Sequence, residues 1–163
     1  MTSFEMTSQG EAGTRALAAA LAPELAAGDL VILDGGLAAG KTTLVKGIAA
    51  ELASPDVVTS PTFALAHFYR SRSGPILHID AYRLSGLPEF RDLGLDDYIA
   101  ESITLIEWGA KVAADFPARL TIGLGFVPDQ PDHRLVRLRA DGAGWDERLA
   151  RLRSAMDNVV TAR

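Results

Sequence analysis

The segment from Gly35 to Thr42 has the residue types and spacing of a phosphate-binding loop. It reads Gly-Gly-Leu-Ala-Ala-Gly-Lys-Thr and fits the pattern G-x-x-x-x-G-K-[ST]. In such a loop the backbone N–H groups and the following helix N-terminus bind phosphate, Lys41 reaches the β- and γ-phosphates, and the Thr42 hydroxyl binds Mg²⁺. A glycine-rich turn before an ordinary helix would contain the same letters. The apolar run before the loop and the helical pattern after it favour the phosphate loop.

Two acidic residues follow apolar runs and have the chemistry to assist at a magnesium ion. Asp80 ends one run and Glu107 ends another. A carboxylate on a strand beside the phosphate-loop strand can hold the metal or orient an attacking water. We expect the strand that carries Asp80 to occupy that place. The alternatives are an Asp that caps the turn before Tyr82 and a Glu that caps a helix over residues 109–116.

Other polar residues near these acids give weaker signals. His78 lies two residues before Asp80, so both side chains face the same side of a strand, and we interpret His78 as a packed, hydrogen-bonded histidine near the site. His67 and His133 have no spacing typical of metal ligands. Hydroxyl residues in the segment 59–63 could sense a γ-phosphate, as in a switch loop, although a plain turn would look the same.

Hydrophobic periodicity predicts the elements that must position these groups. Apolar strands that alternate with helices favour an α/β fold, a three-layer domain with a mixed, mostly parallel central sheet. Two hairpins make the sheet mixed. The spacing of Ser8 and Glu11 predicts a capping box at the first helix. The expected helices cover residues 9–22, 42–52, 88–92, 95–99 and 145–156, and the expected strands cover 30–33, 63–69, 76–79, 103–106, 120–126 and 135–138.

Length and composition exclude several classes of protein. The 163 residues predict one domain over residues 1–163, and the absence of cysteine excludes a disulfide partner, a Cys zinc site and a Cys nucleophile. No apolar run is long enough for a membrane span, and no basic residue precedes an apolar run at the N-terminus, so we expect a cytoplasmic protein without membrane contact. The net charge of −5 argues against purely electrostatic binding of nucleic acid.

The charge is unevenly distributed along the chain. Residues 134–163 contain seven arginines and four acids, which give +3, whereas the first 133 residues carry −8. Arginines of this tail could face a partner protein or a nucleic-acid backbone, or they could balance the acidic part of the same chain.

Several motifs occur in one order along the chain. They are Leu33–Thr43 around the loop, Ser60–Phe63, His78–Leu84, Glu89–Tyr98 and Ile106–Trp108. Together they resemble the TsaE (YjeE) family, the bacterial ATPase subunit of tRNA threonylcarbamoyladenosine synthesis. The resemblance spans roughly residues 9–140. A phosphate loop alone is common to many families, but Ser-Pro-Thr-Phe, Asp-x-Tyr-Arg-Leu and Ile-Glu-Trp in this order are far more specific.

The resemblance implies a small P-loop ATPase that uses ATP and Mg²⁺ and works with the proteins TsaB and TsaD. These build the threonylcarbamoyl group on adenosine 37 of tRNAs that read codons beginning with A. ATP binding and hydrolysis are expected to reset the partner complex rather than to make the modification. The chain would then meet tRNA indirectly, through that complex.

The family's functional residues carry over onto matching positions of this chain. Catalytic roles fall on Lys41, Asp80 and Glu107, and magnesium binding falls on Thr42, Glu107 and Asp80. The implied nucleotide contacts are Ser8, Leu37, Ala38, Ala39, Gly40, Lys41, Thr42, Thr43, Thr62 and Arg134, with Ser8 and Arg134 on the base or ribose side.

Two loop positions depart from the family's usual Gly-Asp-Leu-Gly-Ala-Gly-Lys-Thr. Gly36 replaces the Asp and Ala38 replaces the middle Gly. If φ at Ala38 is positive, alanine costs on the order of 1 kcal/mol or more, which affects the expected hydrolysis more than the binding.

The alternative functions are a small-molecule kinase on the same fold and a nucleotide-binding regulatory subunit with negligible turnover. A kinase usually needs an arginine-bearing lid, and no arginine cluster between Thr43 and Glu107 has that form.

Overall fold

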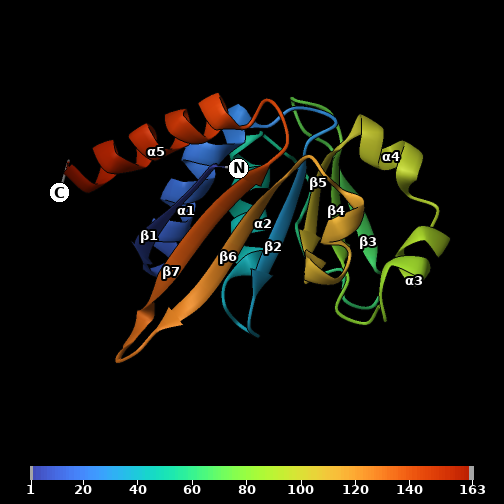
Figure 1. Ribbon diagram of the computed structural model, residues 1–163, viewed down its shortest axis with the longest axis horizontal. Coiled ribbons are helices and arrows are strands. Elements are labelled where there is room, and N and C mark those ends of the chain that lie inside the picture. Colours follow the sequence, from blue (N-terminus) through green and yellow to red (C-terminus); the bar gives the residue numbers. More distant parts are fainter. Residues whose placement is uncertain (1, 162–163) are drawn as a thin grey trace.

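A seven-stranded mixed sheet forms the centre of the computed structural model, which describes residues 2–161 (Figure 1). The strands are β1 (Thr2–Gln9), β2 (Leu30–Gly35), β3 (Ala66–Tyr69), β4 (Ile76–Asp80), β5 (Ile103–Glu107), β6 (Arg119–Val127) and β7 (Gln130–Asp141). The helices are α1 (Gly10–Leu21), α2 (Lys41–Glu51), α3 (Leu87–Asp92), α4 (Asp96–Glu101) and α5 (Asp146–Thr161). Short 3₁₀ turns cover Ala22–Glu24, Gly109–Lys111 and Ala113–Asp115.

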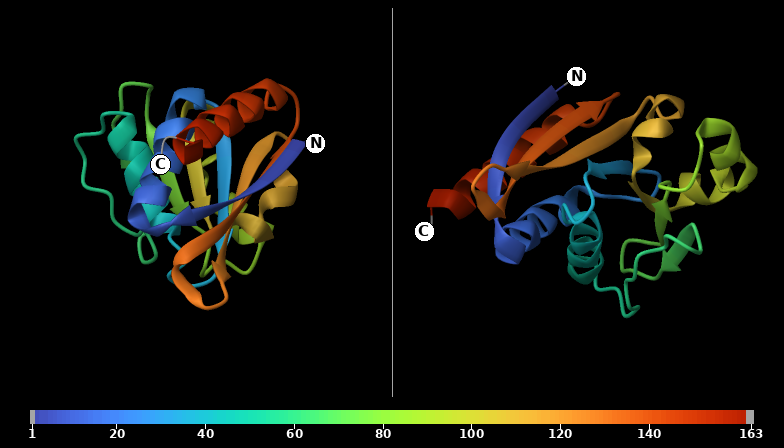
Figure 2. Two further views of the ribbon diagram at one scale, coloured as in Figure 1. Left: turned by 90° about the vertical axis from the view of Figure 1, so that its left-hand side faces the viewer. Right: turned by 90° about the horizontal axis from the view of Figure 1, so that it is seen from below.

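The strand order is β1-β7-β6-β2-β5-β4-β3. The pairs β6–β2, β2–β5 and β5–β4 are parallel, whereas β1–β7, β7–β6 and β4–β3 are antiparallel. The prediction of a mixed sheet with a largely parallel centre is therefore confirmed. Figure 2 shows β1 (blue) along β7 (orange) at one edge of the sheet, so the first and last strands of the chain are neighbours.

Helices cover both faces of the sheet and form three layers (Figures 1 and 2). One apolar cluster joins α1, α2 and α5 to the sheet through residues such as Leu17, Leu44 and Leu149. A second cluster joins α3 and α4 to the opposite face through Phe90 and Ile99. Strands covered on both faces need continuous apolar runs, which is the pattern of β2 and β5.

Three details of the elements differ from expectation. The strand β1 was not predicted, and it contains Ser8, so the capping-box prediction is wrong: α1 begins at Gly10 and has no side-chain cap at Gln9. The strand expected over residues 63–69 begins only at Ala66. Residues 62–64 form a turn that the Pro61 carbonyl closes by accepting a hydrogen bond from the Leu65 N–H.

Within residues 2–161, the structure has no helix with the length and apolar character needed to span a bilayer.

Candidate functional site

A polar cavity of about 350 Å³ lies where β2, β4 and β5 end and α2 begins. Carboxyl ends of parallel strands meet at one edge of a sheet, which is the usual place for ligand sites in such folds. The residues that line the cavity are Leu37, Ala38, Ala39, Gly40, Lys41, Thr42, Thr43, Ser60, Thr62, Asp80, Glu107 and Trp108. All predicted site residues except Ser8 and Arg134 are in this set. Figure 1 shows the turn that joins β2 to α2, below the arrowhead of β2.

Two glycines shape the loop between β2 and α2. Gly40, at the start of α2, has φ of 109°, a conformation that L-residues rarely adopt. Gly35 has φ of 151°, and a Cβ there would lie 2.5 Å from the Leu124 carbonyl oxygen. Among the described residues, no side chain caps the amino end of α2. The first N–H groups of this helix are therefore available to an anionic ligand.

Lys41 is folded back onto the loop. Its Nζ donates hydrogen bonds of 2.8 Å to the carbonyl oxygens of both Gly35 and Gly36, and it lies 4.0 Å from the centre of the Trp108 ring. Burial lowers the pKa of Lys41, and the nearby charges of Glu107 and other acids oppose this only in part. The ammonium group is thus held at the rim of the cavity by contacts that a phosphate could replace.

Glu107 makes the shortest contact with the start of α2. The Thr42 hydroxyl donates a 2.6 Å hydrogen bond to Glu107 Oε1, and His78 Nε2 lies 2.9 Å from Oε2. Burial raises the pKa of Glu107, but the hydrogen bonds from His78 and Thr42 and the charges of His78 and Lys41 bring it below its ordinary value. A buried, ionised carboxylate next to a threonine hydroxyl gives two oxygen ligands suited to Mg²⁺.

Asp80 lies in the same cavity but has different partners. It accepts hydrogen bonds from the Thr62 hydroxyl at 2.7 Å and from the Tyr82 N–H at 2.8 Å. The Thr62 hydroxyl also lies 2.7 Å from the Ser60 hydroxyl. Asp80 therefore connects the segment 59–62 to the end of β4.

The strand order corrects one expectation about these acids. Asp80 and Glu107 are register neighbours on β4 and β5, but β5 lies between β4 and the phosphate-loop strand β2. The strand beside β2 thus brings Glu107 to Thr42. We had expected the strand of Asp80 in that place, and a sequence does not reveal the order of its parallel strands.

Two aromatic residues at the site had been given no role from the sequence. The Tyr69 hydroxyl lies 3.0 Å from His78 Nδ1 and 3.1 Å from the Thr59 carbonyl oxygen. Because a phenol has one proton, Tyr69 donates to only one of these acceptors at a time. The second residue, Trp108, packs against Lys41 as described above. The Ile-Glu-Trp motif marks Trp108 in the sequence, whereas Tyr69 has no local signal.

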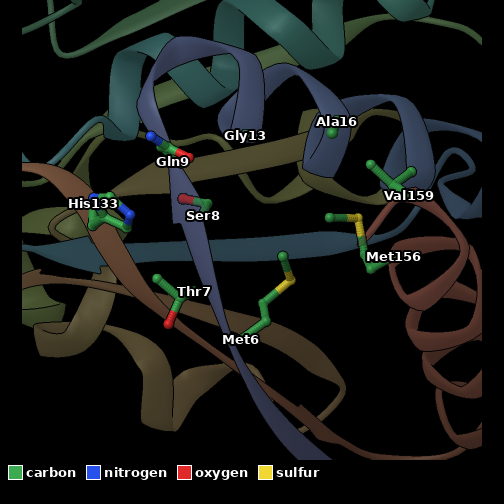
Figure 3. Close-up of a pocket in the computed structure, with 9 residues that line it drawn as sticks. All are labelled: Met6, Thr7, Ser8, Gln9, Gly13, Ala16, His133, Met156 and Val159. Atoms are coloured by element: carbon green, nitrogen blue, oxygen red, sulfur yellow. The ribbon is translucent and has the colours of Figure 1, made fainter. Parts of the chain in front are cut away.

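Ser8 and Arg134 lie outside the phosphate cavity. They are register partners on β1 and β7. Arg134 donates hydrogen bonds to the Ala39 carbonyl at 3.0 Å and to the Ala38 carbonyl at 3.4 Å, so it contacts the loop from its other side. Ser8 is buried in a separate cavity of about 200 Å³ with Met6, Met156 and other apolar neighbours (Figure 3).

Among residues 2–161, no cluster of three or more His, Asp and Glu side chains is arranged to hold a metal ion.

Comparison with known proteins identifies the family. The sequence matches the profile of "Threonylcarbamoyl adenosine biosynthesis protein TsaE" over residues 8–134, which is most of the chain. The chain belongs to the TsaE family. A TsaE protein of Streptomyces coelicolor is 49% identical over 135 residues, which are 81% of each chain. That of Bacillus subtilis is 36% identical over 148 residues, or 90% of each chain.

The fold also matches a solved structure. The crystal structure of Bacillus subtilis YdiB superimposes with a TM-score of 0.79 and 28% sequence identity, and it covers 94% of this chain and 95% of that one. The fold and family predicted from the sequence are therefore confirmed: this is a tRNA threonylcarbamoyladenosine biosynthesis protein of the TsaE family.

One departure from the TsaE loop pattern has a visible structural consequence. Ala38 has φ of 61°, in the left-handed region where a glycine would be unstrained. Because φ at Ala38 is positive, the conformational cost expected for an alanine at this position applies.

Proposed function

We propose that this chain is the ATP-binding, Mg²⁺-dependent ATPase subunit of tRNA threonylcarbamoyladenosine formation. The observation that carries the proposal is the convergence of Lys41, Thr42 and Glu107 at the uncapped start of α2, in a chain of the TsaE family. The one-sheet architecture, in which β1 and β7 pair, supports a single ATPase domain over the whole chain.

The nucleotide phosphates would bind to the loop and the first turn of α2. Backbone N–H groups of residues 37–43 would bind the β-phosphate, and the helix dipole would favour its negative charge. Lys41 exchanges its two carbonyl partners for phosphate oxygens, because an ammonium–phosphate contact is stronger than a contact with neutral acceptors. Such an exchange would explain why a lysine is held at the rim of an anion-binding loop.

A magnesium ion would be held by Thr42 and Glu107, with further ligands from phosphates and water. The 2.6 Å hydrogen bond between their oxygens supports this assignment, because two ligands of one cation must lie close together. The ion's contribution is to neutralise charge on the β- and γ-phosphates. Asp80 lies beside Glu107 and is held by the hydrogen bonds that it accepts from the Thr62 hydroxyl and the Tyr82 N–H, so it would orient a water. The hydroxyl groups of Thr62 and Ser60 would then sense the γ-phosphate.

The base and ribose would extend toward Ser8 and Arg134. Arg134 supports the proposal because it already contacts the loop through Ala38 and Ala39.

The partners proposed are TsaB and TsaD, with tRNA bound indirectly through that complex and with a cytoplasmic location.

Measurement of ATP binding and phosphate release, alone and with TsaB and TsaD, tests this function. We expect ATP binding by the chain alone and faster phosphate release when both partners are present. Lys41→Ala should abolish nucleotide binding, because Lys41 is the only cationic side chain among the described residues that line the phosphate cavity. Retained binding in this variant would contradict the assignment of the loop, and phosphorylation of a small acceptor would favour a kinase.

A nucleotide-binding regulatory subunit is the second candidate, and the positive φ of Ala38 favours it. Tight ATP binding without turnover, alone and with both partners, would support that function over the first.

A further inference from the structure

A second, larger groove lies at the other end of the sheet. Its volume is about 710 Å³, and it is lined by Phe68, Tyr69, Arg70, Ser71, Gly74, Pro75, Tyr98, Glu101 and Ser102. These residues come from the carboxyl end of β3, the turn before β4, and α4. The α4 end of the sheet lies opposite the turn that joins β2 to α2 (Figure 1). An occupant of this groove would leave the phosphate cavity open.

The backbone of β3 is unpaired along this groove. Among residues 2–161, β3 is the last strand of the sheet and pairs only with β4. The Asp80 N–H bonds the Leu65 carbonyl, so the alternation of an antiparallel ladder turns the N–H and C=O groups of Ala66 and Phe68 away from β4. An edge of this kind accepts an added strand.

Two aromatic side chains are exposed at the same place. Phe68 and Tyr98 are 50% and 53% exposed, and their rings meet edge to face with centroids 5.3 Å apart. The motif around Tyr98 is part of the TsaE resemblance, yet none of residues 89–98 lines the phosphate cavity. The proposed nucleotide chemistry therefore does not account for this motif.

The charges beside the aromatic pair are acidic and lack partners. In the part of the chain that the structure describes, neither Asp97 nor Glu101 has an ion-pair partner, and both are exposed. They lie four residues apart on α4, where like charges repel each other, and Glu101 is the last residue of the helix, where the dipole disfavours an acid. The arginine on the opposite rim, Arg70, is bound to Asp56.

We propose that this groove binds an extended segment of a partner protein that alternates basic and apolar residues. The segment adds a strand to the free edge of β3, places apolar side chains against Phe68 and Tyr98, and places lysine or arginine side chains near Asp97 and Glu101. The basic character follows from the two unpartnered acids, and the extended form follows from the free strand edge. This inference goes beyond the proposed nucleotide chemistry and does not require it.

The test uses the full chain and a labelled seven-residue peptide that alternates lysine and valine, with a glutamate–valine peptide for comparison. Fluorescence polarisation measures binding, and NMR measures hydrogen exchange at Ala66 and Phe68. We expect the lysine peptide to bind at least about tenfold more tightly than the glutamate peptide and to slow exchange at both amides. Phe68→Ser should weaken binding about tenfold. Asp97→Asn combined with Glu101→Gln should weaken it about threefold and reduce its salt dependence.

Matched controls remove an equally exposed aromatic ring or two acids elsewhere. Phe126→Ser, and Glu51→Gln combined with Asp129→Asn, should leave peptide binding unchanged. Equal losses in the control and groove variants would overturn the proposal, because binding would then be non-specific. Unchanged exchange at Ala66 and Phe68 in the bound state would also overturn it. If the chain itself dimerises through β3 in light scattering, and Phe68→Ser abolishes the dimer, a second copy is the occupant and the partner proposal is wrong.

Discussion

At the scale of single residues, Ala38 is the position where the loop departs most clearly from unstrained geometry. Its φ of 61° costs an L-residue about 1–2 kcal/mol. Ala38→Gly removes this strain but adds freedom to the unfolded chain, worth about 0.5–1 kcal/mol. We therefore expect the free energy of unfolding to rise by up to about 1 kcal/mol in urea titration. Ala39→Gly is the control: Ala39 is buried and its φ is not positive, so this change should destabilise the protein. A loss of stability in Ala38→Gly would contradict the inference that the backbone at Ala38 is strained.

The two acids of the phosphate cavity should respond differently to neutralisation. Glu107 contacts Thr42 directly, whereas Asp80 contacts Thr62 and the Tyr82 N–H. Glu107→Gln should therefore reduce the gain in ATP affinity on adding Mg²⁺ by at least about tenfold, and Asp80→Asn should reduce it less. Isothermal titration with and without Mg²⁺ measures both, and ATP affinity in EDTA shows whether each variant still folds a phosphate loop. The reverse order of effects would make Asp80 the direct ligand.

Between elements, Tyr69 connects β3 to the site and to the segment 59–62. Tyr69→Phe removes the hydroxyl that contacts His78 Nδ1 and the Thr59 carbonyl. Because a buried polar group is left without its partner, we expect a loss of about 1–3 kcal/mol in stability, with faster hydrogen exchange in residues 59–62. Tyr98→Phe is the matched control, since that ring is 53% exposed and its change should stay within about 0.5 kcal/mol. Equal exchange in both variants would show that Tyr69 does not hold the segment.

How much could be predicted from the sequence differed between the centre and the edges of the sheet. The strands β2, β4 and β5 are buried on both faces, so they read as mostly apolar runs, and the phosphate loop follows a fixed pattern. The edge strand β1 alternates partly buried and exposed residues, with Phe4 and Met6 on the inner face. This period of two lies in a short, mostly polar segment, which does not predict a strand by itself. The contact between Tyr69 and His78 depends on strand register, which no local pattern encodes. The predicted roles of the site residues remain predictions.

Over the whole molecule, several arginines of the basic tail form ion pairs with acids of the first 133 residues. Arg137 pairs with Glu5, Arg148 with Asp29 and Arg151 with Glu24. The remaining described arginines of the tail also have contacts: Arg134 with the loop, Arg139 with Asp141 and Arg153 with the Phe4 ring. Arg163 lies outside the described residues. Most of the tail arginines are therefore engaged within the folded chain. This favours the interpretation that they balance acids of the same chain over the one in which they face a partner or tRNA.

This arrangement predicts how the tail behaves toward tRNA in a complex with TsaB and TsaD. An arginine engaged by an acid of its own chain neutralises few phosphates, so reversing it releases few counterions. Arg151→Glu combined with Arg153→Glu should leave the tRNA affinity of the complex unchanged. The slope of log affinity against log salt concentration should change by less than about one unit. The stability of the chain should fall only slightly, because the Arg151–Glu24 pair is exposed to solvent on its arginine side. Arg15→Glu combined with Arg72→Glu makes the same change in net charge away from the tail and controls for long-range effects. Weaker tRNA binding with a smaller salt slope in the tail variant alone would show that these arginines contact the nucleic acid.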